Sequence, residues 1–354
     1  MNIMNKIILN AKGLALTLLG ALIADALSIP LPWLLGPLIA SLFLGALGKP
    51  IACDSRWRIC GQIIIGMALG LYFTPNLLTA LTTYGHFIVL GLVWSMMLGL
   101  LLAWLQFKIN HVDWSTAWFS SAIGSASEMV NIAEQYHAQV DKVVAAHSLR
   151  LLLLVLIVPF FMTLYFSVDL SQMITKQEAS YDVEMMLGLF ILAIIVGKVF
   201  NHFHVLNAWL LGPLCLIAGL ALTSTLNLKF PSWFIYFGQL CIGWSLASKF
   251  PFDFLKNNRE FIWKTVLFNL FALMLTLILV EFLAIFSDTD QKILLLGLAP
   301  GGIAEMSLTA KALGLAVPVV VAFQLSRLIF VIITTRYLYQ LTCRVIFQED
   351  ISSK

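Results

Sequence analysis

Glu128, Arg150, Glu305 and Arg327 are charged side chains that stand inside long apolar stretches of the sequence. A charge at membrane depth costs about 2.5–3.5 kcal/mol on insertion scales, so such a residue is a candidate for function by default. The two carboxylates could bind a cation or exchange protons. The two arginines could pair with the carboxylates when the protein is at rest, or could hold an anionic substrate.

Small and polar residues surround both glutamates, which indicates that the backbone is interrupted there. Pro300-Gly301-Gly302 stands just before Glu305, and Gly124-Ser125-Ala126-Ser127 stands just before Glu128. Asn131 shares a helical face with Glu128, three residues further on. We therefore expect a solute or ion site formed by Gly124, Ser125, Ser127, Glu128, Asn131, Arg150, Gly301, Gly302, Glu305 and Arg327.

A purely structural interpretation of the same residues stays open. Ser125-x-x-Glu128 matches a capping box, in which the glutamate closes the start of a helix. The glutamates and arginines could also form ion pairs that only hold the fold together, because buried charges commonly pair.

The composition predicts a membrane protein. Hydrophobic residues make up 60% of the 354 residues and charged ones only 11%, whereas soluble domains carry about 25% charged residues. The net charge of +3 gives no basic field suited to nucleic acid. The five cysteines and six histidines lack the spacing of a zinc or copper site, so we expect no metal, no cofactor and no enzymatic activity.

Windows of about 20 apolar residues mark twelve candidate segments. The first half contains 5–28, 33–48, 58–74, 86–106, 113–137 and 143–168. The second half contains 183–201, 208–225, 233–249, 261–286, 291–314 and 316–341. Three of them are poor as plain lipid-facing helices: 33–48 is short and holds Gly36-Pro37, 113–137 is too polar, and 291–314 holds Ala299-Pro300-Gly301-Gly302. Broken backbone at membrane depth must be satisfied by protein or a wet cavity, so we expect these segments to be inner elements.

The sequence repeats itself at an offset of about 177 residues. Trp33-Leu34-Leu35-Gly36-Pro37-Leu38 recurs from Trp209, and Gly61-Gln62-x-x-x-Gly66 recurs from Gly238. Ala122-x-Gly124-x-x-x-Glu128-Met129 recurs from Ala299, and Arg150 falls on Arg327. We expect repeats at 1–168 and 183–345, separated by a polar linker at 169–182.

The loop charges predict that the two repeats are inverted. The loop 49–58 carries Lys49, Arg56 and Arg58, which favours the cytoplasmic side. The next loop, 75–85, is uncharged, while its repeat equivalent near 249–260 is basic. Equivalent loops on opposite sides require an odd number of crossings in each repeat. Six segments become five crossings if the broken segment enters and leaves on one face.

The predicted fold is therefore an all-α integral membrane protein of two inverted five-crossing repeats, each with a broken or re-entrant segment, and 10–12 hydrophobic segments in all. Inverted repeats with interrupted helices are typical of secondary transporters, whose sites lie near the bilayer midplane. We expect an inner (cytoplasmic) membrane location, with both termini cytoplasmic. The expected partners are the lipid bilayer and a small solute or ion, such as a proton or sodium, with no direct nucleic acid. A homo-oligomer is left open.

The duplicated Trp-Leu-Leu-Gly-Pro-Leu element, the Pro300-Gly301-Gly302-x-x-Glu305-Met306 motif and the chain length resemble the membrane AbrB family, over essentially the whole chain. The resemblance implies an inner-membrane protein, and members have carried the labels ammonia monooxygenase and regulator of gene expression. The soluble transition-state regulator of the same name is a small β-rich DNA-binding protein, which this chain does not resemble. The first repeat departs from the motif, with Ile123-Gly124-Ser125 in place of Pro-Gly-Gly.

Two functions follow as alternatives. The first is a secondary transporter or ion-coupled exchanger of a small solute. The second is a membrane-bound sensor or regulator that influences gene expression indirectly. A monooxygenase would need a metal site, which the histidines do not supply.

Overall fold

The computed structural model describes residues 3–49, 51, 53–73, 77–166, 183–223, 230–250, 254, 257–287 and 289–347, and within these ranges it contains fourteen helices and no strand. The described residues divide into two compact units. The first unit draws on 1–80, 155–250 and 304–318, and the second on 81–154, 251–303 and 319–354. Each unit thus takes segments from both halves of the sequence. The predicted linker 169–182 lies outside the described residues.

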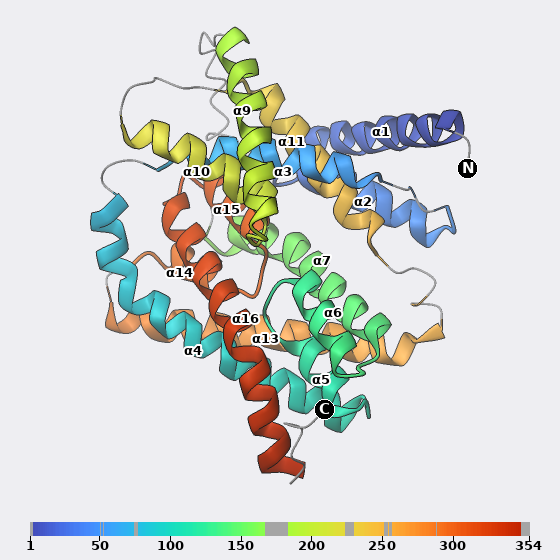
Figure 1. Cartoon of the computed structure of the whole chain (residues 1–354), viewed down its shortest axis with the longest axis vertical. Coiled ribbons are helices and arrows are strands. Elements are labelled where there is room, and N and C mark those ends of the chain that lie inside the picture. The colour runs from blue at the N-terminus through green and yellow to red at the C-terminus, as the bar shows by residue number, and fades with distance from the viewer. Residues whose placement is uncertain are drawn as a thin grey trace. The chain divides into compact units, whose positions relative to one another are not determined.

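Each of the twelve predicted segments contains at least one helix among its described residues. The helices are α1 (Ile3–Ala26), α2 (Pro32–Ala46), α3 (Ser55–Gly70), α4 (Leu77–Ile109), α5 (Trp114–Ser121), α6 (Ala126–Gln135), α7 (Val140–Tyr165), α9 (Val183–His202), α10 (Ala208–Leu222), α11 (Ser232–Ser248), α13 (Arg259–Phe286), α14 (Gln291–Leu298), α15 (Ile303–Ala312) and α16 (Val317–Phe347). The predicted segments 113–137 and 291–314 are each split into two short helices, as expected, and Figure 1 shows them as separate ribbons.

The Gly-Pro segments do not break. Helix α2 continues through Pro37, and α10 continues through Pro213. Proline removes a single N–H, and neighbouring helices can satisfy the carbonyl that is left free. The glycines serve close packing instead: a β-carbon on Gly36 would lie 2.6 Å from Cα of Ala21 in α1, and one on Gly212 would lie 3.0 Å from Cα of Gly197 in α9. Seven of the 15 residues of α2 and eight of the 15 residues of α10 are buried, although only the α2 segment was predicted to be an inner element.

The first unit joins α1, α2 and α3 to α9, α10 and α11, with α3 packed against α10 and α11 and α2 packed against α11 (Figure 1). Its packing is reciprocal between the two halves of the sequence. Gly66 of α3 abuts the carbonyl oxygen of Leu210 in α10, and Gly243 of α11 abuts the carbonyl oxygen of Leu34 in α2. Backbones approach this closely only where the side chain is a hydrogen atom. The Gly-Gln motifs are therefore packing positions.

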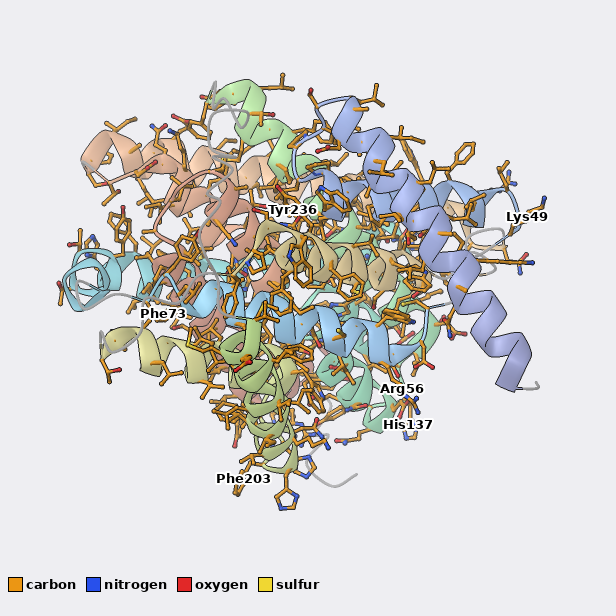
Figure 2. The ribbon with its side chains drawn as sticks, turned by 90° about the horizontal axis from the view of Figure 1, so that it is seen from above. Lys49, Arg56, Phe73, His137, Phe203 and Tyr236 are labelled. Atoms are coloured by element: carbon orange, nitrogen blue, oxygen red, sulfur yellow. The ribbon has the colours of Figure 1, made fainter. Side chains whose placement is uncertain are left out.

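Five helices are long and apolar enough to cross a membrane, within the part of the chain that the structure describes. They span Thr82–Ile109, Val140–Tyr165, Val183–His202, Arg259–Phe286 and Val317–Val345. Several of these helices expose apolar side chains every fourth residue, as in Ile333, Tyr337, Leu341 and Val345 of α16. Figure 2 shows Phe203, just after α9, pointing away from the ribbon, and this side chain is 72% exposed. Continuous apolar faces of this kind suit lipid rather than water, so the chain is a membrane protein.

Candidate functional site

Two interrupted helices have the same construction. Helix α5 has eight residues, ends at Ser121 and is followed by the ten residues of α6. Helix α14 also has eight residues, ends at Leu298 and is followed by the ten residues of α15. The residue after each eight-residue helix turns the chain out of the helix in the same way, with φ −53° and ψ 131° at Ala122 and φ −59° and ψ 138° at Ala299. We call residues 122–125 the first break and 299–302 the second break.

An aspartate starts each of the eight-residue helices. The Asp113 carboxylate accepts a hydrogen bond from the backbone N–H of Thr116 at 2.9 Å, and the Asp290 carboxylate accepts one from the backbone N–H of Lys292 at 2.9 Å. Such N-caps satisfy backbone donors that have no partner inside the helix.

A buried arginine closes the other end of each of these helices. Arg150 of α7 donates to the carbonyl oxygens of Ala122, Ser120 and Ser121 at 2.8, 2.9 and 3.1 Å. Arg327 of α16 donates to the carbonyl oxygens of Ala299 and Gly301, at 2.6 Å in both cases. The last carbonyls of a helix lack partners and carry partial negative charge, which a guanidinium group matches well.

A second polar side chain stands one turn before each arginine. His147 Nε2 donates to the carbonyl oxygen of Phe119 at 2.9 Å, and Gln324 Nε2 donates to that of Leu296 at 2.6 Å. Our sequence interpretation did not include these two residues. Both residues lie three positions before the arginine, and this common position could have revealed them. A search for identical residues at the repeat offset does not find them, because one is a histidine and the other a glutamine.

The two arginines differ in their side-chain partners, since Arg327 also donates from Nη2 to Oε1 of Gln324 at 2.6 Å. Arg150 Nε donates to Oδ1 of Asn269 in α13 at 3.2 Å, and Asn269 in turn donates to the carbonyl oxygen of Thr265 at 2.8 Å. Arg327 Nε is buried and has no hydrogen-bond partner among the described residues. Among the described residues, the Nε donor of the arginine is therefore satisfied at the first break and not at the second.

The first-repeat site residues gather at the start of α6. Gly124 lies in the first break, Ser125 is the N-cap residue, and Glu128 lies in the first turn. The capping-box interpretation is wrong, because the Ser125 hydroxyl makes no cap bond and instead lies 3.0 Å from the hydroxyl of Ser127. Asn131 is exposed on the same short helix.

An ion pair between Glu128 and Arg150 is also not formed, because the donors of Arg150 are directed to carbonyl and amide oxygens.

The second-repeat site residues lie on both sides of the second break. Arg327 donates to the carbonyl oxygen of Gly301. The backbone N–H of Gly301 donates to the carbonyl oxygen of Ala299 at 2.8 Å. Gly302 is the last residue of the break, and Glu305 lies in the first turn of α15. Across the described residues, neither the Glu128 nor the Glu305 carboxylate bonds to another residue. No group of three or more potential metal ligands occurs in those same residues.

A family model described as "Transition state regulatory protein AbrB" matches residues 33–342. "Uncharacterized protein YhjN" of Bacillus subtilis is 25% identical over 358 residues, 93% of this chain and 91% of the relative. "Putative regulator AbrB" of Escherichia coli is 22% identical over 313 residues, 87% of this chain and 89% of the relative. No solved structure matches. Since the family model spans most of the chain and includes both breaks, this protein belongs to the AbrB family.

Proposed function

We propose that this protein is an ion-coupled secondary transporter or exchanger of a small solute, with Glu128 and Glu305 as the residues that bind the coupling ion, a proton or sodium. One observation carries the proposal. The arginines and their neighbours satisfy the helix ends at both breaks, while the two carboxylates remain without a bond to another described residue. An acidic side chain in that state can take up a cation at little structural cost, because no bond to another residue has to be broken.

The lengths of the broken helices support a re-entrant arrangement. Eight residues of α-helix extend about 12 Å and ten extend about 15 Å, whereas the hydrocarbon core is about 30 Å thick. Neither half-helix can cross alone. We propose two inverted repeats, 1–168 and 183–345, of five crossings each, with the two breaks meeting near the bilayer midplane.

The basic residues between the end of α2 and the first turn of α3, Lys49, Arg56 and Arg58, favour a cytoplasmic loop, in an inner membrane, with both termini on the cytoplasmic side. Figure 2 shows one of them, Lys49, at the edge of the ribbon.

A second candidate function is an indirect regulator of gene expression. The name of the Escherichia coli relative, a putative regulator, favours it. Such a protein would bind its ligand at the breaks without moving it across the membrane. We further infer that the protein is not an enzyme. Elemental analysis of the purified protein tests this inference, and a stoichiometric metal would contradict it.

Flux measurements distinguish the two functions. Purified protein is reconstituted into liposomes, and proton and sodium fluxes are recorded with a pH-sensitive dye and radioactive sodium. We expect Glu128→Gln and Glu305→Gln to abolish the flux of the coupling ion. Glu260→Gln, which removes an exposed carboxylate paired with Lys264, should leave the flux unchanged.

The transporter proposal is overturned if wild-type protein moves neither ion and both variants keep the cellular phenotype of the wild type. A thermal-shift screen of small solutes against wild-type protein would then identify the ligand that is sensed.

A further inference from the structure

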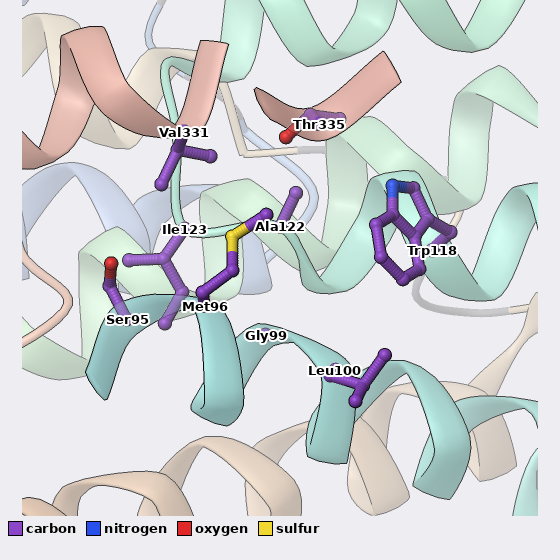
Figure 3. A pocket seen from close by; sticks show the side chains of 9 residues that line it. All are labelled: Ser95, Met96, Gly99, Leu100, Trp118, Ala122, Ile123, Val331 and Thr335. Carbon is purple, nitrogen blue, oxygen red and sulfur yellow. The ribbon is translucent and has the colours of Figure 1, made fainter. Parts of the chain in front are cut away.

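A small hollow in the second unit lies against the first break. Helix α4 contributes Met96 and Gly99, α5 contributes Trp118, and α16 contributes Thr335, while Ala122 and Ile123 of the break form its inner wall. Figure 3 shows these side chains around the hollow, with the nitrogen of the Trp118 ring on the side nearer Thr335. The hollow is open on one side and holds about 260 Å³ of empty space, the space at its mouth included, but its enclosed part has room for only one water-sized group, so an occupant places an oxygen there and the rest of the molecule at the mouth.

Two polar atoms at this hollow have no partner in the described part of the chain: Nε1 of Trp118 and Oγ1 of Thr335. Both residues are almost fully buried, with 5% and 1% of their surface exposed. Buried polar groups are nearly always hydrogen-bonded, and each exception calls for an explanation such as a bound molecule. An apolar occupant would leave both of these polar atoms without a hydrogen bond.

The same two helices show how such an indole is satisfied elsewhere. Trp114 lies one turn before Trp118 on α5, and its Nε1 donates directly to Oγ1 of Thr342 on α16 at 3.2 Å. Thr335 lies two turns before Thr342 on α16. The Trp118 ring is held by its neighbours Trp114 and Tyr339, with ring centroids 5.8 and 6.2 Å away. Trp118 and Thr335 thus repeat the pattern of Trp114 and Thr342, but without the direct bond.

We propose that this hollow binds a small uncharged molecule through a hydroxyl or carbonyl oxygen, which accepts a hydrogen bond from Trp118 and bonds to Thr335. An indole N–H can only donate, so the occupant must present an acceptor. No charged side chain lines the hollow, so the occupant is uncharged. A lipid acyl chain would leave both polar atoms unpaired, which excludes it as the natural occupant.

This site goes beyond the proposed coupling-ion residues, since it takes an uncharged group and uses neither glutamate. It adjoins Ala122, the residue whose carbonyl oxygen Arg150 holds, so an occupant contacts the end of α5 directly. The inference holds whether the protein transports a solute or senses one.

Fluorine NMR tests it on the full chain in detergent micelles, with 5-fluorotryptophan in place of tryptophan and 1-propanol as the probe. The Trp118 and Trp114 signals are assigned from their loss in Trp118→Phe and Trp114→Phe. We expect 1-propanol to shift the Trp118 signal saturably and to leave the Trp114 signal within the drift produced by solvent alone. Thr335→Val should weaken the apparent affinity for 1-propanol at least tenfold, and Thr342→Val should not change it.

Xenon, an apolar probe, distinguishes the remaining outcomes. A saturable shift of the Trp118 signal with xenon but not with 1-propanol would show an apolar hollow and overturn the proposal. A Trp118 signal that responds only to exchange of water for deuterated water would show a water site alone and would overturn it equally. Because Trp118→Phe removes a donor that has no partner among the described residues, the variant should remain folded, and its melting temperature reports whether it does.

Discussion

Arg150 donates to the carbonyl oxygen of Ala122 at 2.8 Å, and this bond closes helix α5 at the point where the chain leaves it. The equivalent bond, from Arg327 to the carbonyl oxygen of Ala299, closes α14. In both cases the buried guanidinium charge faces neutral oxygens at the negative end of a helix dipole rather than a carboxylate. The arginines are thus explained as parts of the breaks, and the glutamates are left available for a cation.

Replacing Arg150 by glutamine should strongly destabilise the protein. The shorter side chain cannot reach the three carbonyl oxygens that Arg150 satisfies, and unsatisfied buried acceptors cost about 1–3 kcal/mol each. We expect a loss of roughly 3 kcal/mol or more, measured as a lower melting temperature in detergent. The control is Arg336→Gln on the exposed face of α16, which should change stability by less than about 0.5 kcal/mol. Equal effects at the two positions would rule out the capping role.

Replacing Asn269 by leucine should make Arg150 resemble Arg327. Arg150 Nε would lose its acceptor, and a hydrogen bond to a charged group contributes about 1.5–3 kcal/mol. The double variant Arg150→Gln/Asn269→Leu isolates this bond by a mutant cycle. We expect the two substitutions together to cost less than the sum of their separate effects. Strict additivity would mean that Asn269 does not act through Arg150.

The sequence predicted the elements better than the contacts. The repeated landmarks located both broken segments, because a polar or Gly-rich interruption is visible in an apolar stretch. The partners of Arg150 were not predictable, since a carboxylate and three backbone carbonyls are equally plausible acceptors until the distances are known. Asn269 was also missed, because it stands alone among apolar residues and has no counterpart at the repeat offset. The segment with Gly36-Pro37 was expected to be interrupted, but α2 continues through Pro37, because a single proline in the sequence does not show whether a helix ends or continues.

The topology is a different kind of prediction. Inversion of the repeats was inferred from loop charges, and the number of crossings rests on counting both broken segments as re-entrant. Cysteine accessibility in the loops 49–58 and 249–260, measured in intact cells with a membrane-impermeant reagent, tests it. We expect both loops to be protected, since both are predicted to be cytoplasmic. Labelling of only one of the two loops from outside would contradict the inverted arrangement.

Asp113 should contribute to stability in a way that depends on pH. Burial by itself would raise the pKa of this carboxyl, but hydrogen bonds from Ser115, Thr116 and Gln139 outweigh it and hold the pKa below its usual range. A lowered pKa in the folded state stabilises the protein above the unfolded-state pKa of about 3.9, and this stabilisation is lost as the pH falls through the folded-state pKa. Melting temperatures between about pH 3 and 6 should therefore fall less steeply with acid in Asp113→Asn than in wild type. Asp141→Asn, which removes an exposed carboxylate at the start of α7, should follow the wild-type curve.

The reciprocal packing of the first unit can be tested at its glycines. A β-carbon on Gly66 would collide with the carbonyl oxygen of Leu210, and one on Gly243 with that of Leu34. Backbone atoms cannot move aside cheaply, so Gly66→Ala and Gly243→Ala should each cost about 1–3 kcal/mol or prevent folding. Gly219→Ala is the matched control, because a β-carbon there meets nothing within 4 Å. Alanine favours a helix over glycine by about 1 kcal/mol, so Gly219→Ala should leave the melting temperature unchanged or raise it. If instead only one of the two packed glycines tolerates alanine, the halves of the sequence do not contribute equivalently to this unit, and the case for a duplicated membrane repeat weakens.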